Sequence, residues 1–178
     1  MSGDVLVTGA TGHVGANIVA HLNQNGVRPR VLLRRASRTT AIDDLKWAPT
    51  VGDVTDPASL TEAMRGVEVV YHAAAVVSFA RSQRARMTQV NVQGTRNVIA
   101  AGMAAGIGRL VFTSSVAAIG SGLRPEDRLD EDHIYNLDRF KLSYAQSKRR
   151  SEAVVTEAVR EHGLSAVIIN PALVLGER

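Results

Sequence analysis

The sequence predicts an α/β fold, a doubly wound parallel sheet with the strand order 3-2-1-4-5-6. Short and nearly continuous apolar runs alternate with longer amphipathic stretches, and the first apolar run leads directly into a glycine-rich turn. Strands that are apolar throughout are typical of a parallel sheet covered by helices on both faces. Right-handed crossovers then give this strand order. No internal repeat or linker interrupts residues 1–178, so we expect one dinucleotide-binding domain.

The first half of the chain predicts four strands and two helices. Gly26 is placed to end the first helix. Asp56 is placed to cap the second helix, with Pro57 at its first position. Thr50–Val54 includes or follows a short third strand. The other expected strands are Asp4–Thr8, Arg30–Arg34 and Val67–Ala75 with its exit, and the expected helices are Gly12–Asn25 and Pro57–Arg65.

The second half predicts two long helices and two further strands. The first helix runs from about Ser82 to Ala105, and a strand follows at Arg109–Ser115. Leu123–Leu142 is a polar loop. The second helix covers Ser143–His162, and the last strand is Ser165–Pro171. Strands and helices therefore alternate to the end of the chain.

The composition excludes several classes of function. With 45% hydrophobic and 21% charged residues the chain is globular, and without cysteine it has neither a disulfide framework nor a thiolate metal site. Net charge is +4 but aromatic residues are only 4%, so nucleic-acid binding is not expected. No apolar run has the length of a membrane span, and the N-terminus lacks a secretory signal. The cytoplasm is the default expectation, with no metal and no membrane partner.

The turn TGATGHVG predicts a dinucleotide site. Its glycines are Gly9, Gly12 and Gly15, a G-x-x-G-x-x-G pattern between the first strand and the first helix. Glycine allows a tight turn and a close approach of backbone to phosphate, and the helix N-terminus favours the pyrophosphate. We expect Thr11, His13 and Val14 of the same turn to contact the cofactor as well.

The end of the second strand favours NADP over NAD. Arg34 and Arg35 stand where NAD-selective sites place a carboxylate, and no acid follows until Asp43. Arginine accommodates the 2′-phosphate of NADP, so NADP is the expected cofactor and NAD the alternative. Asp53 and Val54 fit the adenine edge. Small residues after the fourth strand let backbone lie against the cofactor: Ala73, Ala74 and Ala75.

Tyr144 and Lys148 lie four residues apart in YAQSK, which places them on one face of a helix. An ammonium beside a phenol favours the phenolate, so we expect Lys148 to lower the pKa of Tyr144 from its usual value. A general acid or base works best when its pKa is near the operating pH. His72 is expected to lie at a strand end without a chemical role.

Seven motifs occur in a fixed order from Val5 to Gly176: TGATGHVG, GDVTD, HAAA, NVQGT, FTSS, YAQSK and NPALVLG. In this order they resemble the extended short-chain dehydrogenases/reductases, the NAD-dependent epimerase/dehydratase family. The similarity is to the dihydroflavonol-reductase and 3β-hydroxysteroid-dehydrogenase-like branch and to sugar-nucleotide epimerases.

The resemblance implies a role for each matching residue. Tyr144 resembles the general acid/base, and Lys148 resembles the residue that binds the nicotinamide ribose and tunes the tyrosine. Ser115 aligns with the catalytic hydroxyl, with Ser114 as the alternative. Asn91 resembles a helix asparagine that supports the proton relay. The position that flanks the nicotinamide is matched by Pro171.

Three functions are compatible with these residues. The first is NADP-dependent reduction or oxidation of a small-molecule carbonyl or alcohol. The second is an epimerase or dehydratase that holds NAD, and the third is a dinucleotide-binding module without turnover. Extended members continue past NPALVLG into a substrate segment, whereas this sequence stops at Arg178. The resemblance also implies a homodimer through the helices at 82–105 and 143–162.

Overall fold

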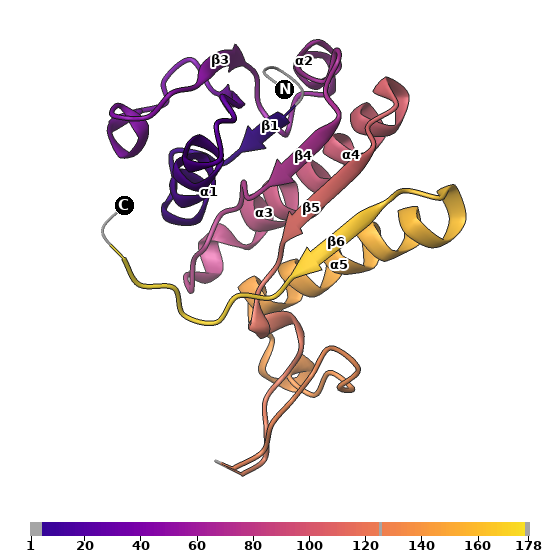
Figure 1. Ribbon diagram of the computed structural model, residues 1–178. Coiled ribbons are helices and arrows are strands. Elements are labelled where there is room, and N and C mark those ends of the chain that lie inside the picture. The colour runs from indigo at the N-terminus through magenta and orange to yellow at the C-terminus, as the bar shows by residue number, and fades with distance from the viewer. Residues whose placement is uncertain (1–4, 125, 177–178) are drawn as a thin grey trace.

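The computed structural model describes residues 5–124 and 126–176. Its centre is a six-stranded parallel sheet in the order β3-β2-β1-β4-β5-β6, so the predicted topology is confirmed (Figure 1). Asp4, the expected first residue of the first strand, lies outside the described residues. The strands are β1 Val5–Thr8, β2 Arg30–Leu33, β3 Ala48–Val51, β4 Val69–His72, β5 Arg109–Thr113 and β6 Ala166–Ile169.

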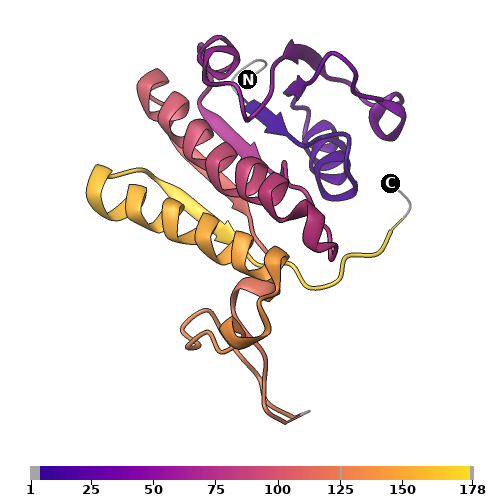
Figure 2. The same ribbon diagram turned by 180° about the vertical axis from the view of Figure 1, so that it is seen from behind.

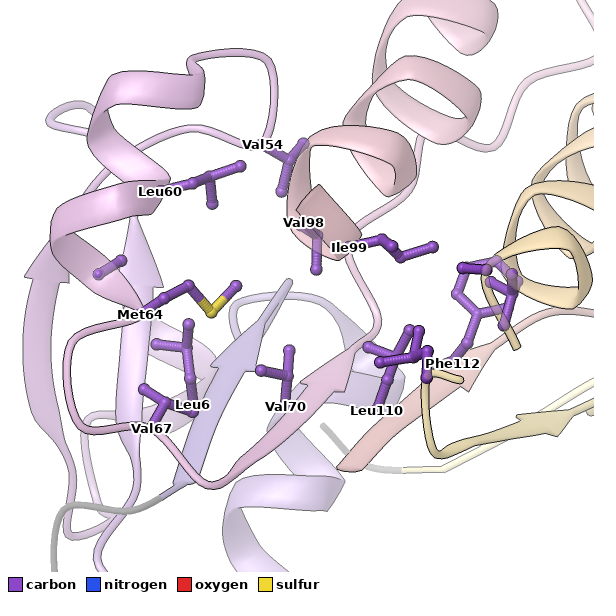
Figure 3. Close-up of a cluster of buried hydrophobic side chains, with 14 of the residues drawn as sticks. Leu6, Val54, Leu60, Met64, Val67, Val70, Val98, Ile99, Leu110 and Phe112 are labelled. Carbon is purple, nitrogen blue, oxygen red and sulfur yellow. The ribbon is translucent and has the colours of Figure 1, made fainter. Parts of the chain in front are cut away.

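Helices cover both faces of the sheet. Helix α1 (His13–Gln24) lies on one face, and α2 (Pro57–Ala63), α4 (Gly94–Ala105) and α5 (Ser143–His162) lie on the other, with α4 and α5 side by side (Figure 2). The two helix layers pack on separate apolar clusters. The larger cluster lies under α2, α4 and α5 and includes Leu6, Met64 and Phe112 (Figure 3).

The expectation that Thr50–Val54 includes or follows a short strand is confirmed, because the third strand begins two residues before this range and ends within it. Strand β3 covers Ala48–Val51, and Gly52 and Asp53 already leave the sheet. Pro49 lies within this strand, opposite Val31. A proline lacks the N–H of a ladder hydrogen bond, but an edge strand tolerates it. The end of β3 at Val51 places Asp53 in a loop at the carboxyl edge of the sheet.

The expected single helix from Ser82 to Ala105 is interrupted. A 3₁₀ turn, Arg81–Gln83, leads into the short helix α3 (Arg84–Met87), and a π-helix over Thr88–Gln93 precedes α4. A π turn within a longer helix is often found at a functional site. The hydrophobic periodicity therefore predicts the extent of the helical segment, but not the 3₁₀ and π turns within it.

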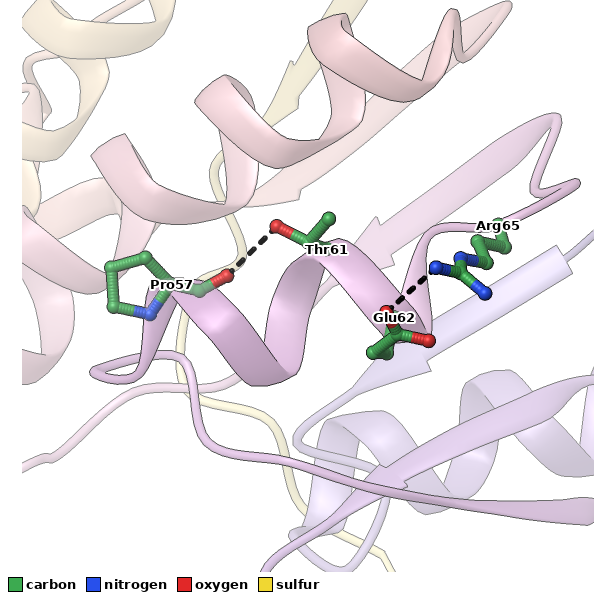
Figure 4. Close-up of polar contacts among 4 residues, drawn as sticks. All are labelled: Pro57, Thr61, Glu62 and Arg65. Carbon is green, nitrogen blue, oxygen red and sulfur yellow. Dashed lines mark hydrogen bonds and ion pairs between the residues drawn. The ribbon is translucent and has the colours of Figure 1, made fainter.

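Helix α2 begins as predicted. Oδ1 of Asp56 accepts hydrogen bonds from the N–H groups of Ala58 and Ser59, and Pro57 occupies the first turn. Thr61 Oγ1 donates to Pro57 O at 3.1 Å, and Arg65 pairs with Glu62 at 2.9 Å on the exposed side (Figure 4). The cap fixes where the chain turns after Asp53, which lies in the candidate site.

Within residues 5–124 and 126–176, no helix is both long and apolar enough to cross a membrane. The same residues contain no cluster of His, Asp and Glu side chains arranged to hold a metal ion.

Candidate active site

The glycine turn closes tightly against the chain that leaves β4. Gly9 has a φ of +73°, and a Cβ at this position would lie 2.5 Å from Ala74 N. A Cβ at Gly15 would overlap the carbonyl oxygen of Gly9. Gly12 precedes α1 in an extended conformation, and its N–H donates to Gly9 O at 3.0 Å. The turn therefore requires glycine and brings the N-terminus of α1 to the carboxyl edge of the sheet.

A cleft of about 640 Å³ opens beside this turn. The cleft is bordered by the glycine turn, the end of β2 and the loop after β3, where the pyrophosphate, ribose and adenine are expected. Most of the predicted cofactor residues line it. These are Gly9, Thr11, Gly12, Arg34, Asp53, Val54, Ala73, Ala74 and Ala75. The first-turn N–H groups of α1 and the space left by absent side chains suit a dinucleotide.

Five predicted cofactor residues, from the glycine turn, the end of β2 and the segment after β6, lie outside the lining of this cleft. Arg35 is exposed and is not part of the cleft lining, whereas Arg34 is. Gly15 is buried and serves the packing of the turn. A separate hollow of about 430 Å³ lies between α1, Tyr71 and residues 171–176, and it is lined by the remaining predicted residues, His13, Val14 and Pro171.

The cleft also contains polar residues that the sequence analysis did not single out. Ser37 accepts a hydrogen bond from Arg34 N at 3.1 Å, which closes the turn after β2. Arg86 of α3 and Gln89 of the π-helix also line the cleft. Within the described part of the chain, neither Arg34 nor Arg86 forms an ion pair. The R-x-x-S spacing of Arg34 and Ser37 is the signal that could have identified Ser37.

Asp53 has one carboxylate oxygen committed to its own loop. Its Oδ1 accepts from the N–H and from the hydroxyl of Thr55, each at 2.8 Å. This pair of bonds shapes an Asx turn at the end of β3. Within the described residues, no hydrogen bond is formed to Oδ2, so this oxygen is available to a donor in the cleft.

Ser115 and Tyr144 come together although 28 residues separate them in the sequence. Ser115 follows β5, where its Oγ accepts from Ala117 N at 3.2 Å. Tyr144 lies in the first turn of α5. Burial raises the pKa of Tyr144 above its usual value, and a hydrogen bond from Ser115 to the phenol partly offsets this rise.

Lys148 lies one turn further along α5 and is 4% exposed. Its Nζ donates to Thr113 O at 2.6 Å and lies 5.2 Å from the centre of the Phe112 ring. Burial lowers the pKa of Lys148 to about 8, against a smaller opposing effect of Glu152. The expected lowering of the Tyr144 pKa by Lys148 is wrong for this structure, because the ammonium bonds a main-chain oxygen and burial dominates at the phenol.

Asn91 is buried in the π-helix, and within the described residues its side chain forms no hydrogen bond with Tyr144 or Ser115. Its Oδ1 accepts from Val76 N at 2.7 Å, and its Nδ2 donates to Val76 O and to Ser147 Oγ, each at 2.9 Å. The amide is therefore fully used in holding the segment after β4 against α5. The alternative serine, Ser114, is buried, and its hydroxyl lacks a partner within the described residues.

Comparison with known proteins identifies the class. Residues 5–178 match the model of the NAD dependent epimerase/dehydratase family. The chain belongs to that family, the extended short-chain dehydrogenases/reductases.

Relatives agree with this assignment. The chain is 40% identical over 172 residues to "Sterol demethylase protein B" of Methylococcus capsulatus, covering 96% of this chain and 51% of the relative. It is 39% identical over 170 residues to a "Putative dihydroflavonol 4-reductase" of Synechocystis, covering 96% and 49%. A short-chain dehydrogenase/reductase superfamily protein from Agrobacterium tumefaciens, solved with bound NAD, is similar at 32% identity and a TM-score of 0.75, covering 96% and 48%. The chain thus spans about half the length of the relatives it matches.

Proposed function

We propose that this chain binds NADP and carries the catalytic residues of an oxidoreductase that transfers hydride between the nicotinamide and a small-molecule carbonyl or alcohol. The observation that supports this most is the hydrogen bond between Ser115 and Tyr144 beside the end of β5, to which Lys148 is also bonded, at the same carboxyl edge of the sheet as the glycine-turn cleft. Ligands of doubly wound sheets bind at this edge. When bound, the nicotinamide supplies or accepts the hydride.

The three side chains divide the remaining work. In the reduction direction, Tyr144 protonates the oxygen of the substrate carbonyl as negative charge develops there. Ser115 donates a hydrogen bond to the same oxygen and orients it. With the cofactor bound, Lys148 would exchange Thr113 O for a ribose hydroxyl, which would bring its charge toward the phenol. That charge would lower the pKa of Tyr144 from the raised value that burial gives it.

The preference for NADP is supported by the charges of the cleft. Arg34 lines it at the end of β2, and no carboxylate from that strand end faces it. Arg86 of α3 adds a second cation to the lining of the cleft. A guanidinium suits phosphate oxygens through paired hydrogen bonds. The 2′-phosphate of NADP would therefore find a charge partner where the ribose 2′-hydroxyl of NAD would not.

Calorimetric titration and turnover test this proposal together. We expect saturable binding of NADPH by the chain, and tighter binding than of NADH. The Tyr144→Phe variant keeps NADPH binding and loses the oxidation of NADPH by a carbonyl panel. Equal turnover of the variant and the parent chain overturns the role of Tyr144. Binding without any turnover by the parent chain favours a dinucleotide-binding module.

A second candidate is an epimerase or dehydratase that holds NAD. It is supported by the family to which the chain belongs and by the relative solved with NAD. The same residues would then remove and return a proton at a sugar hydroxyl. A clear preference for NAD over NADP in the same titrations would favour it.

We also propose a homodimer through α4 and α5, as the family resemblance implies. The two helices lie side by side on one face of the molecule, and their outer surface has a shallow hollow of about 430 Å³ lined partly by Ile99, Met103 and Val154. Sedimentation equilibrium tests this. A charge placed in the hollow, as in Met103→Glu, should shift a dimer to monomer.

A further inference from the structure

We infer that His72 and Thr95 are positioning residues, because a directional chain of buried hydrogen bonds through them joins the cofactor cleft to the helix that bears Tyr144 and Lys148. The expected effect on NADPH binding rests on the proposed function, whereas the hydrogen-bond chain itself rests only on the contacts described below. Neither residue is part of the cleft lining. Both are almost completely buried, at 1% exposure each.

The chain begins at the wall of the cleft. Ala74 N donates to Thr8 Oγ1 at 3.3 Å, and Thr8 Oγ1 lies 2.7 Å from Nδ1 of His72. On the other side of the ring, Nε2 lies 3.0 Å from Thr95 Oγ1. Thr95 Oγ1 in turn donates to Asn91 O at 2.6 Å. A contact sequence thus crosses from β1 through β4 to α4 and the π-helix.

The partners fix the protonation of the imidazole. A carbonyl oxygen only accepts, so the single hydroxyl proton of Thr95 goes to Asn91 O. Nε2 of His72 must then carry a proton and donate it to Thr95 Oγ1. The ring is neutral because burial, aided by the charge of Lys148, lowers the pKa of His72 to about 3. Nδ1 is therefore an acceptor, and the Thr8 hydroxyl, which already accepts from Ala74, donates to it.

All bonds along this route point the same way, from Ala74 toward Asn91. Bonds in such a series polarise one another, and buried members have no water to replace a lost partner. At the far end, Asn91 O also accepts from Ser151 Oγ at 2.8 Å. The Asn91 amide donates to Ser147 Oγ, which donates to Tyr144 O at 2.7 Å. The route therefore ends on the main chain of the proposed acid/base residue.

The geometry gives the chain a function beyond packing. Ala74 is at once a wall of the cleft and the amide against which Gly9 packs. Asn91 holds Val76, two residues further on, by two hydrogen bonds. The segment after β4 is thus held at both ends by one network, and the same network holds α5. A substitution of Thr95 should therefore change the affinity for the cofactor, although Thr95 does not line the cleft.

Thr95→Val, Thr95→Ser and Val98→Ala form the test set. Valine keeps the shape of threonine and removes the hydroxyl, whereas serine keeps the hydroxyl. Val98 is fully buried one turn further along α4 and is outside the network, so Val98→Ala is a control for lost stability. Three quantities are measured on the full chain: the ¹⁵N shifts of the His72 ring, the exchange rate of the Ala74 amide, and the NADPH dissociation constant well below the melting temperature.

In the parent chain we expect a neutral His72 ring with a pyrrole-type Nε2 and a pyridine-type Nδ1. Thr95→Val should speed Ala74 exchange and weaken NADPH binding by about tenfold, a difference of roughly 1.4 kcal/mol. Thr95→Ser should restore both, and Val98→Ala should lower stability alone. The opposite tautomer, or a charged ring, overturns the inference even if Thr95→Val does not fold. The inference is also overturned if the Ala74 exchange rate in Thr95→Val equals that of the parent chain. It is overturned as well if Val98→Ala loses as much NADPH affinity as Thr95→Val. If the parent chain binds no NADPH, the proposed function fails, while the ring shifts and Ala74 exchange still decide the network.

Discussion

Nζ of Lys148 lies 2.6 Å from the main-chain oxygen of Thr113, so an ammonium on α5 is bonded to the last residue of β5. Ser115 follows two residues later and hydrogen-bonds Tyr144. The contact therefore holds α5 over the strand end that positions Ser115. In this state the lysine has a structural partner, and a bound ribose would have to compete for its protons.

The first prediction concerns this buried cation. Burial lowers the pKa of Lys148 to about 8 from 10.5, so between these values the unfolded chain binds more protons than the folded one. Stability should consequently rise as pH rises from about 8 to about 10.5, by about 3 kcal/mol at most. Below about pH 8 both states are protonated and the full cost of the buried charge is present.

Lys148→Met should remove this rise, which urea unfolding at pH 7 and at pH 10 would detect as a smaller difference between the two pH values. The exposed Lys141→Met variant is the matched control and should keep the parent slope. An unchanged slope in Lys148→Met would contradict the assignment of the titration to this side chain.

The second prediction concerns acid stability. Because burial lowers the pKa of His72 to about 3 from 6.5, the unfolded chain takes up a proton in this window that the folded chain does not. Stability should fall as pH drops from about 6.5 toward about 3. His72→Gln should be less stable at neutral pH and flatter across the window. His21→Gln, on the exposed side of α1, should follow the parent curve. Parallel curves for His72→Gln and the parent would refute this.

The third prediction compares a glycine of the cofactor turn with a glycine at the end of α1, to separate loss of NADPH binding from loss of stability. A methyl group at Gly15 would overlap Gly9 O, so Gly15→Ala must open the turn and should lose NADPH binding together with stability. Gly26 also has a positive φ but has open space around it. Gly26→Ala should therefore cost about 1 kcal/mol of stability and leave the NADPH dissociation constant unchanged. Thermal unfolding and calorimetric titration of both variants provide the comparison.

The fourth prediction tests the choice between the cofactors. Arg34 lines the cleft and Arg35 does not, so Arg34→Glu should weaken NADPH binding by at least about tenfold and spare NADH. Arg35→Glu makes the same change of charge one residue away and should have a much smaller effect. Equal losses in the two variants would mean that general charge attraction, rather than a specific phosphate contact, determines the affinity.

The sequence predicted those parts of the fold that depend on local pattern. Apolar runs and the glycine turn give the strand order, and the Asp56–Pro57 pair gives the start of α2. The start of β3 at Ala48 is harder to predict, because proline at position 49 disfavours a strand unless the strand lies at the edge of a sheet. The π-helix was missed because hydrophobic periodicity does not encode which hydroxyl will bind Asn91 O.

In the candidate site, too, some features follow from the sequence pattern and others depend on tertiary packing. Ser115 follows β5 and Tyr144 lies in the first turn of α5, so both lie at the carboxyl edge of the sheet, where they meet. The partner of Lys148 and the environment of His72 depend on side chains that are distant in sequence. His72 binds Thr8 and Thr95, which are 64 and 23 residues away, and such pairings are set by packing. Their chemistry became visible only with the fold.

A crystal structure of the chain soaked with NADP would decide whether the cleft and the Ser115–Tyr144 pair form one site. We predict the pyrophosphate at the turn of Gly9 and Gly12, the 2′-phosphate beside Arg34, and the nicotinamide ring next to the hydroxyls of Tyr144 and Ser115. A dinucleotide bound with its nicotinamide end away from those two hydroxyls would contradict it, as would a cleft that stays empty at saturating NADP.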